Sequence, residues 1–77
     1  MARRTLIRSL GEEVRVRRKA LGLSQIALAY EAEVHPNVIG RIERGEYNPT
    51  LALLLLLVKP LGVSLSALIA AAEKRGG

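Results

Sequence analysis

Residues Ser24–Gly45, SQIALAYEAEVHPNVIGRIERG, predict two short helices joined by a tight turn. Ser24 suits the start of the first helix, since its hydroxyl can accept a hydrogen bond from a first-turn amide. We expect this helix to end near Ala32. Its predicted apolar face consists of Ile26, Ala27, Leu28 and Ala32.

The second helix of the pair is predicted to begin at Pro36 and to stop at Gly45. Proline suits the first helical position, and it pushes the preceding His35 out of the helical region of backbone space. Glycine is the residue preferred just beyond a helix end. The predicted inward side chains are Val38, Ile39 and Ile42. The predicted outward residues are Asn37, Gly40, Arg41 and Arg44, which are small, hydrogen-bonding or cationic, as contacts to base edges and phosphates require.

Helical spacing continues on both sides of this pair. A first helix is predicted to end at Gly22 and to carry an apolar stripe made of Ile7, Leu10, Val14 and Leu21. Residues 45–50, GEYNPT, are predicted to form a loop. No alternation of period two persists along the chain, so we predict an all-α fold of five helices.

Two more helices are expected after the loop. Thr50 can cap a fourth helix, which Pro60 should kink or end near Lys59. Its predicted inward stripe is Leu51, Leu54, Leu57, Val58 and Leu61. Ser64 can cap a short fifth helix with apolar positions at Leu65, Leu68 and Ile69, and residues 70–77 are expected to fray.

Composition sets the broad class. The chain has 77 residues, a net charge of +5, a pI near 10.5 and no break in composition, so residues 1–77 are expected to form one basic domain. Such a charge is typical of nucleic-acid binders, although charge alone identifies no target. The absence of cysteine excludes a disulfide framework.

The N-terminal residues lack the apolar core of a signal peptide, and the run 51–58 is too short to cross a bilayer, so we expect a cytoplasmic protein without membrane insertion.

Four segments in this order resemble the lambda-repressor-like helix-turn-helix family, which includes phage Cro and repressor proteins and small restriction-modification controllers. The segments are LGEEVRVRRKALGLSQ, LAYEAEV, VIGRIERGEYNPTL and LGVSLSALI, which span roughly residues 10–69. The resemblance places the helix-turn-helix at about residues 24–45. It implies a phosphate contact for Gln25 and a structural ion pair between Arg18 and Glu43. It also implies major-groove readers at Pro36, Asn37 and Arg41, with His35 and Gly40 beside them.

The sequence departs from the family at several positions. Glu33 occupies a turn position where the family usually has glycine in a left-handed conformation, which costs a residue with a β-carbon roughly 1–2 kcal/mol. Pro36 replaces a side chain that often touches DNA, so part of the usual base contact is missing. Pro60 interrupts a helix that the family usually continues.

Each candidate DNA contact has a structural alternative. Arg41 can donate two hydrogen bonds to guanine or remain a solvated surface arginine, and Asn37 can bind adenine or support the first turn of its helix. Gly40 either permits close approach of the sugar-phosphate backbone or is merely tolerated. The candidate phosphate contacts Gln25, Arg44, Tyr47 and Asn48 are alternatively solvent-exposed residues. His35 is the only histidine, and we interpret it as a residue at the helix start near DNA.

The leucine-rich segment is apolar all round rather than on one face. The surplus can form a deeper local core or a self-association surface. We favour a homodimer through Leu53, Leu55 and Leu56, with residues 51–69 as the dimerisation region. The predicted function is sequence-specific transcriptional regulation on double-stranded DNA. The alternative is a protein-interaction module, such as an antitoxin or adaptor. With no aspartate, no cysteine and one histidine, an enzyme is not expected, nor is a cofactor or bound metal.

Overall fold

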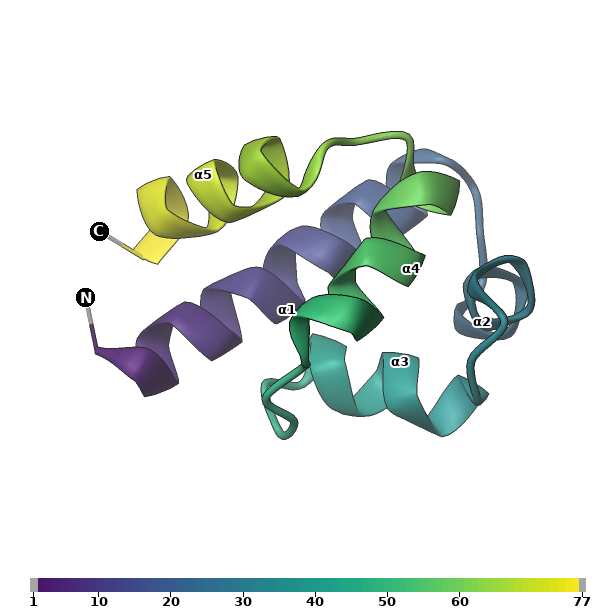
Figure 1. Cartoon of the computed structure of the whole chain (residues 1–77), viewed down its shortest axis with the longest axis horizontal. Helices are drawn as coiled ribbons and strands as arrows, with labels where there is room; N and C mark the ends of the chain where they lie inside the picture. The colour runs from purple at the N-terminus through teal and green to yellow at the C-terminus, as the bar shows by residue number, and fades with distance from the viewer. Residues whose placement is uncertain (1, 77) are drawn as a thin grey trace.

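The computed structural model describes residues 2–76 and has five helices, as the sequence predicted (Figure 1). They are α1 (Arg3–Ala20), α2 (Gln25–Ala32), α3 (Pro36–Glu43), α4 (Leu51–Leu61) and α5 (Leu65–Gly76). The molecule measures 31 × 21 × 21 Å. In Figure 1, α1 and α5 run side by side, and α3 lies across the opposite side of the molecule from α5. None of the described helices is by itself long and apolar enough to span a membrane. α4 and α5 together have the length and the apolar composition, but the chain bends by 98° between them.

Hydroxyl side chains begin three of the helices. The Oγ of Ser24 accepts a hydrogen bond from the Ala27 amide at 3.0 Å. Thr50 and Ser64 make equivalent bonds, at 3.1 Å in each case, to the amides three residues later. Each bond satisfies a first-turn N–H that has no partner within its helix. The predicted caps of the second, fourth and fifth helices are therefore confirmed.

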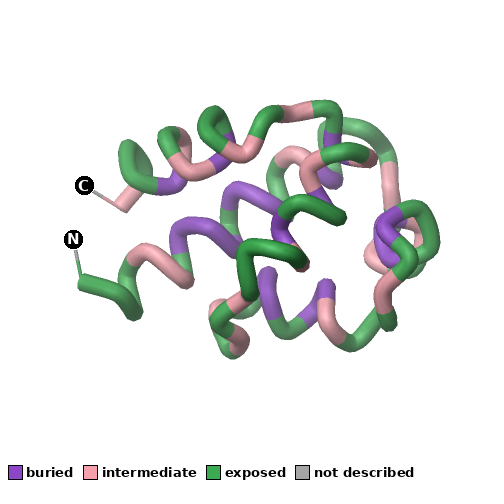
Figure 2. The backbone as a smooth tube through the Cα atoms, viewed as in Figure 1, coloured by how far each residue is buried: buried purple, intermediate pink, exposed green. Residues whose placement is uncertain are grey.

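One apolar core joins the five helices, and Figure 2 shows the buried residues converging between them. Its largest fully buried side chains are Val14, Leu28, Ile39, Ile42, Leu57 and Leu68. α1 and α3 pass so close at Gly11 that a β-carbon there would clash with the carbonyl oxygen of Ile42. This crossing fixes the position of α3 on the scaffold.

Three apolar residues assigned to inward faces are instead exposed. Leu21 follows the last residue of α1 and Leu51 is the first residue of α4, so both lie at helix ends that extend past the core. Ile26 is exposed because α2 buries the stripe Leu28, Ala29 and Ala32, which lies on the other side of that helix. The predictions for these three positions were wrong.

The C-terminal third is more helical than predicted. Pro60 lies within α4, which ends one residue later and is followed by Gly62 at φ 68°. A proline in the last turn removes only one helical hydrogen bond, so the helix continues through it. The fraying expected for residues 70–77 is corrected for residues 70–76, which continue α5, while residue 77 lies outside the described residues. Buried Ala72 and a 3.0 Å ion pair from Arg75 to Glu13 attach this end to α1.

The turn between α2 and α3 has the left-handed residue that the resemblance implied. Glu33 has φ 59° and ψ 43°, and within the described part of the chain it is the one residue other than glycine with a positive φ. Its amide donates to the carbonyl of Tyr30 at 3.2 Å, and the Val34 amide donates to Ala29 at 2.9 Å. The turn thus keeps its closing hydrogen bonds although glutamate occupies the position.

Candidate nucleic-acid interface

The outward face of α3 forms a polar, basic surface together with the start of α2. His35, Pro36, Asn37, Arg41 and Arg44 are exposed along this face. A shallow hollow of about 300 Å³ lies between the two helices. All of its lining residues are candidate DNA contacts from the sequence: Gln25, Pro36, Asn37, Gly40, Arg41 and Arg44.

The first turn of α3 is fixed by its own sequence. Pro36 occupies the first helical position, and the Nδ1 of His35 accepts a hydrogen bond from the Asn37 amide at 3.1 Å. This bond makes His35 the cap of the helix and keeps its imidazole beside the exposed Asn37. The placement of His35 at the helix start agrees with the sequence interpretation.

Gly40 is buried, contrary to the prediction that it points outward. A β-carbon at this position would lie 3.0 Å from Nη1 of Arg44 and 3.5 Å from Oε1 of Gln25. The ends of these two side chains therefore cover Gly40, one from the same helix and one from α2. Because periodicity describes only a residue's own helix, it could not predict this cover.

Two arginines of the surface interact with the loop that follows α3. The guanidinium carbon of Arg41 lies 5.3 Å from the centre of the Tyr47 ring, an arrangement that favours a cation–π contact. Arg44 pairs with Glu46 at 3.1 Å, and more than half of each of these two side chains is exposed. Asn48 is also exposed, whereas Tyr47 is partly buried. These contacts make the loop and the outward face of α3 one continuous surface.

A buried ion pair anchors α3 to α1. Nε of Arg18 donates to Oε2 of Glu43 at 2.6 Å and Nη2 donates to Oε1 at 3.0 Å, while Nη1 donates to the Leu23 carbonyl at 2.8 Å. The hydrogen bond to Glu43 raises the pKa of Arg18 above its ordinary value, against the effect of burial. The structure thus brings together the two residues that the resemblance paired.

Gln25 is attached to the same group. Its Nε2 donates to Oε1 of Glu43 at 3.0 Å, a link that sequence reasoning missed because it joins residues 18 positions apart. Arg18, Gln25 and Glu43 therefore connect α1, α2 and α3. A side chain at the edge of the exposed surface is held in place by a buried carboxylate.

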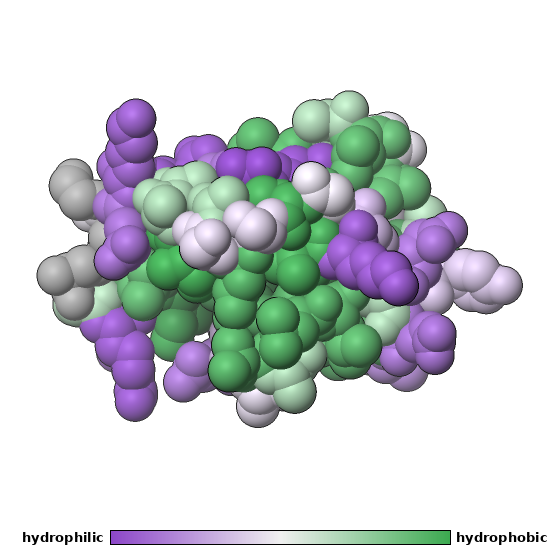
Figure 3. Space-filling model, turned by 45° about the horizontal axis from the view of Figure 1, so that its top comes forward, coloured by the Kyte–Doolittle hydropathy of each residue, from purple (hydrophilic) through white to green (hydrophobic). Residues whose placement is uncertain are grey.

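The leucine-rich helix exposes part of its apolar surface, and Figure 3 shows hydrophobic side chains gathered across this side of the molecule. Leu55 and Leu56 are 53% and 49% exposed. Leu53, assigned to the same surface, is instead partly buried and packs against the core. The prediction for Leu53 is corrected because its position lies next to the buried Leu54 and Leu57 stripe.

Known proteins share both the sequence pattern and this geometry. The model of a family described as helix-turn-helix matches residues 14–68. The chain belongs to the helix-turn-helix family. The predicted resemblance is thereby confirmed.

Two curated relatives and one solved structure show the range of this similarity. Control protein C.SmaI of Serratia marcescens is 42% identical over 60 residues, which cover 78% of this chain and 71% of that protein. The immunity repressor protein of Bacillus phage phi105 is 33% identical over 61 residues, or 79% of this chain. The matched part is only 42% of the phage repressor.

The solved structure is that of the restriction-modification controller protein C.Esp1396I, a tetramer in complex with its natural 35-base-pair operator. It superposes with a TM-score of 0.83 at 28% identity and covers 92% of this chain and 93% of that one. The helix-turn-helix arrangement of α2 and α3 is thus shared with a protein whose structure includes its DNA.

Proposed function

We propose that the protein is a sequence-specific DNA-binding transcriptional regulator that places α3 in the major groove. The exposed basic face of α3, which the Arg18–Glu43 pair fixes to α1, is the main support for this function. An α-helix fits the major groove, where each base pair presents a distinct pattern of donors and acceptors. The family match supports a binding role rather than a catalytic one, and a target on DNA supports a cytoplasmic location.

Within this proposal, Arg41 and Asn37 read bases. Arg41 suits a guanine and Asn37 suits an adenine, since each can form two hydrogen bonds to its base edge. His35 and Pro36 lie beside them at the start of α3, where the missing amide of proline limits the contacts that this end can make.

The remaining surface residues contact the DNA backbone. Arg44 is available for a phosphate because its exposed pair with Glu46 is worth little in water. Gln25 keeps one amide hydrogen beyond its bond to Glu43, and Tyr47 and Asn48 lie on the loop after α3. Buried Gly40 contributes by letting Arg44 and Gln25 lie close together.

We propose further that the regulator is a homodimer, formed through the exposed leucines of α4. A groove of about 290 Å³ lies between the end of α2 and α4, with Leu55 and Leu56 among its lining residues. Glu31 and Glu33 line it from the α2 side and Lys59 from α4. A second copy related by two-fold symmetry would present its own lysine to these acids and cover the leucines. Such a dimer would suit a DNA site with two similar halves.

Selection of binding sites from random double-stranded DNA tests the function. The wild-type protein should enrich a partly palindromic motif with half-sites about 10 base pairs, or a multiple of that, apart. The comparisons do not favour the protein-interaction module considered from the sequence. That alternative would gain support if no motif were enriched.

A further inference from the structure

The start of α1 carries a basic group that the site described above does not include. Arg3, Arg4 and Arg8 fall within the first eight residues, and the first acidic residue of the chain is Glu12. All three arginines are exposed. Sequence reasoning left them out because they lie about 40 residues before the loop that they adjoin in space.

The arginines lie beside the loop that follows α3. A hollow of about 240 Å³ is lined by Arg3, Arg4 and Ile7 on one side and by residues 45–48 on the other. The loop side includes Tyr47 and Asn48, both of which we place against the DNA backbone. The hollow therefore continues the proposed interface from α3 onto α1.

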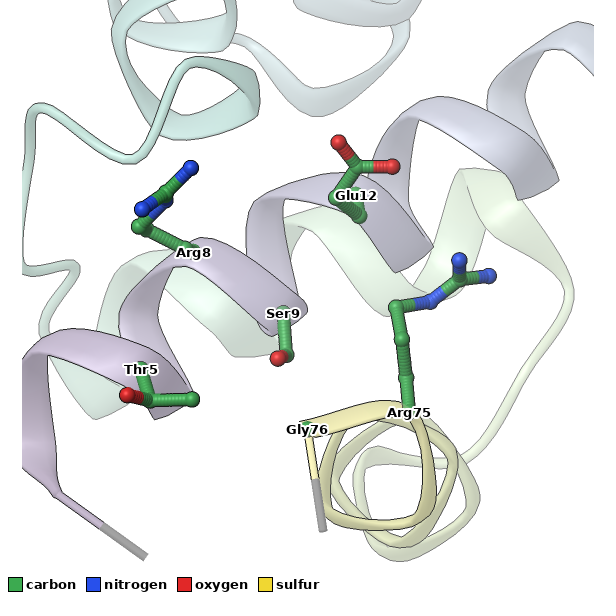
Figure 4. A pocket seen from close by; sticks show the side chains of 6 residues that line it. All are labelled: Thr5, Arg8, Ser9, Glu12, Arg75 and Gly76. Atoms are coloured by element: carbon green, nitrogen blue, oxygen red, sulfur yellow. The ribbon is translucent and has the colours of Figure 1, made fainter.

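Contact between Arg8 and Gly45 fixes the spacing of α1 and this loop. A β-carbon on Gly45 would lie 2.8 Å from Cγ and 3.2 Å from Cα of Arg8, so the loop backbone packs directly on α1. The φ of 72° at Gly45 also favours glycine there. Figure 4 shows the Arg8 side chain pointing away from Arg75 and Gly76 at the end of α5. Arg3 and Arg4 are consequently held at a set position relative to the loop.

The charge of this hollow is not neutralised within the described chain. Arg3 and Arg4 outnumber Glu46, the one acidic residue that lines it. Among residues 2–76, none of the four ion pairs involves Arg3, Arg4 or Arg8. Exposed guanidinium groups without acidic partners are suited to bind phosphate oxygens, and they need break no internal pair to do so.

We propose that Arg3 and Arg4 form an additional phosphate-binding site, which takes the DNA backbone next to the phosphates contacted by the loop at residues 45–48. The proposal rests on the DNA-binding function above and extends its footprint onto α1. These contacts are independent of sequence, because phosphates carry no base information. They strengthen binding to every duplex and make it more dependent on salt.

The salt dependence of binding measures the site directly. The affinity of the wild type and of the Arg3→Gln/Arg4→Gln variant would be measured between 50 and 200 mM salt on a duplex carrying the selected motif. Each phosphate contact changes the slope of log K against log salt by about 0.9, so two contacts make the wild-type affinity fall about 12-fold more than that of the variant. The preferred sequence should not change, since α3 is intact.

Two control variants keep the result specific. Lys19→Gln/Lys74→Gln removes the same charge from exposed positions near the ends of α1 and α5, and it should retain the wild-type slope. Arg3→Lys/Arg4→Lys should also retain the slope, because lysine still binds phosphate. Circular dichroism checks that each variant is helical.

The possible failures are distinguishable. Wild-type protein that shows no preference among duplexes would overturn the proposed function itself. Wild-type protein that binds its motif with the same slope as Arg3→Gln/Arg4→Gln would overturn only the additional site. An equal loss of slope in the Lys19→Gln/Lys74→Gln control would also overturn it, because the effect would then follow net charge alone.

Discussion

Glu33 is the one residue other than glycine with a positive φ among residues 2–76. Three other sharp turns, at Gly22, Gly45 and Gly62, use glycine at φ 68–72°, whereas the turn between α2 and α3 uses glutamate at φ 59°. A β-carbon in this region meets the neighbouring backbone, which costs roughly 1–2 kcal/mol. The family resemblance implied this strain, because it places a left-handed turn at residue 33. The turn still forms its closing hydrogen bonds.

Replacing this residue with glycine should stabilise the fold. We expect Glu33→Gly to raise the free energy of unfolding by roughly 0.5–1 kcal/mol, because relief of strain exceeds the entropy that glycine adds to the unfolded chain. Urea denaturation gives the value. Glu33→Ala is the control, since it keeps the β-carbon and the strain. Equal stability of the glycine and alanine variants would show that the left-handed backbone is not strained.

The Arg18–Glu43 pair joins α1 and α3. The side chains of Arg18 and Glu43 are only 9% and 3% exposed. Because the pKa of Arg18 is raised in the folded protein, the stabilisation from this shift is fully present below the unfolded pKa and is lost only as the pH rises through the folded pKa. The pair therefore remains intact at neutral pH and holds the outward face of α3 in position.

Breaking this pair should be costly. Arg18→Met leaves a buried carboxylate without its partner and should lower the free energy of unfolding by roughly 3–5 kcal/mol. Glu43→Gln should also destabilise the fold, and the double variant should lose less than the sum of the single losses. Thermal and urea melts of the three variants measure this coupling. The exposed pair Arg44 and Glu46, worth about 0–1 kcal/mol, provides the control. Small additive losses at Arg18 and Glu43 would contradict the anchoring role.

Local sequence patterns predicted where the helices begin more accurately than they predicted which single residues are buried. Ser24 and Thr50 start helices through bonds to amides three residues away, so a short window suffices to find them. Leu51 was misplaced because the core ends before the first turn of α4, which depends on the packing of the other helices. Pro60 was expected to kink or end the fourth helix near Lys59, and α4 ends two residues later at Leu61, because a proline in the last turn removes only one helical hydrogen bond.

The same distinction applies to the candidate site. Periodicity predicted the outward positions of Asn37 and Arg41, because they depend on α3 alone. The prediction that Gly40 points outward was wrong, because the side chain of Gln25, from another helix, helps to cover it. Arg3 and Arg4 were missed because the hollow that they line forms only when α1 packs beside the loop after α3.

α4 leaves apolar surface that no other part of residues 2–76 covers. Leu55 and Leu56 are about half exposed, and the groove beside them has acidic and basic residues on opposite sides. Large exposed apolar patches mark interfaces in soluble proteins. A dimer through this surface would place two copies of α3 on one DNA site.

A charged substitution on this surface should separate the dimer. Leu56→Glu should shift the protein toward monomer, because a second copy would have to bury the carboxylate. Sedimentation of the wild type and variant at micromolar concentrations measures the change. Val16→Glu is a matched control, since Val16 on α1 is 48% exposed and Leu56 is 49% exposed. Wild-type protein that remains a monomer at all these concentrations would exclude a dimer with a micromolar dissociation constant.

Whether α3 reads base sequence can be measured with the Arg41→Ala variant. The affinities of wild type, Arg41→Ala and Arg44→Ala would be measured at one salt concentration on the selected duplex and on a set of duplexes with single base-pair changes. Arg41→Ala should cost about 1–3 kcal/mol and abolish preference at one base position, whereas Arg44→Ala should weaken binding to all duplexes alike. Unchanged affinity and unchanged preference in Arg41→Ala would contradict the placement of α3 in the major groove.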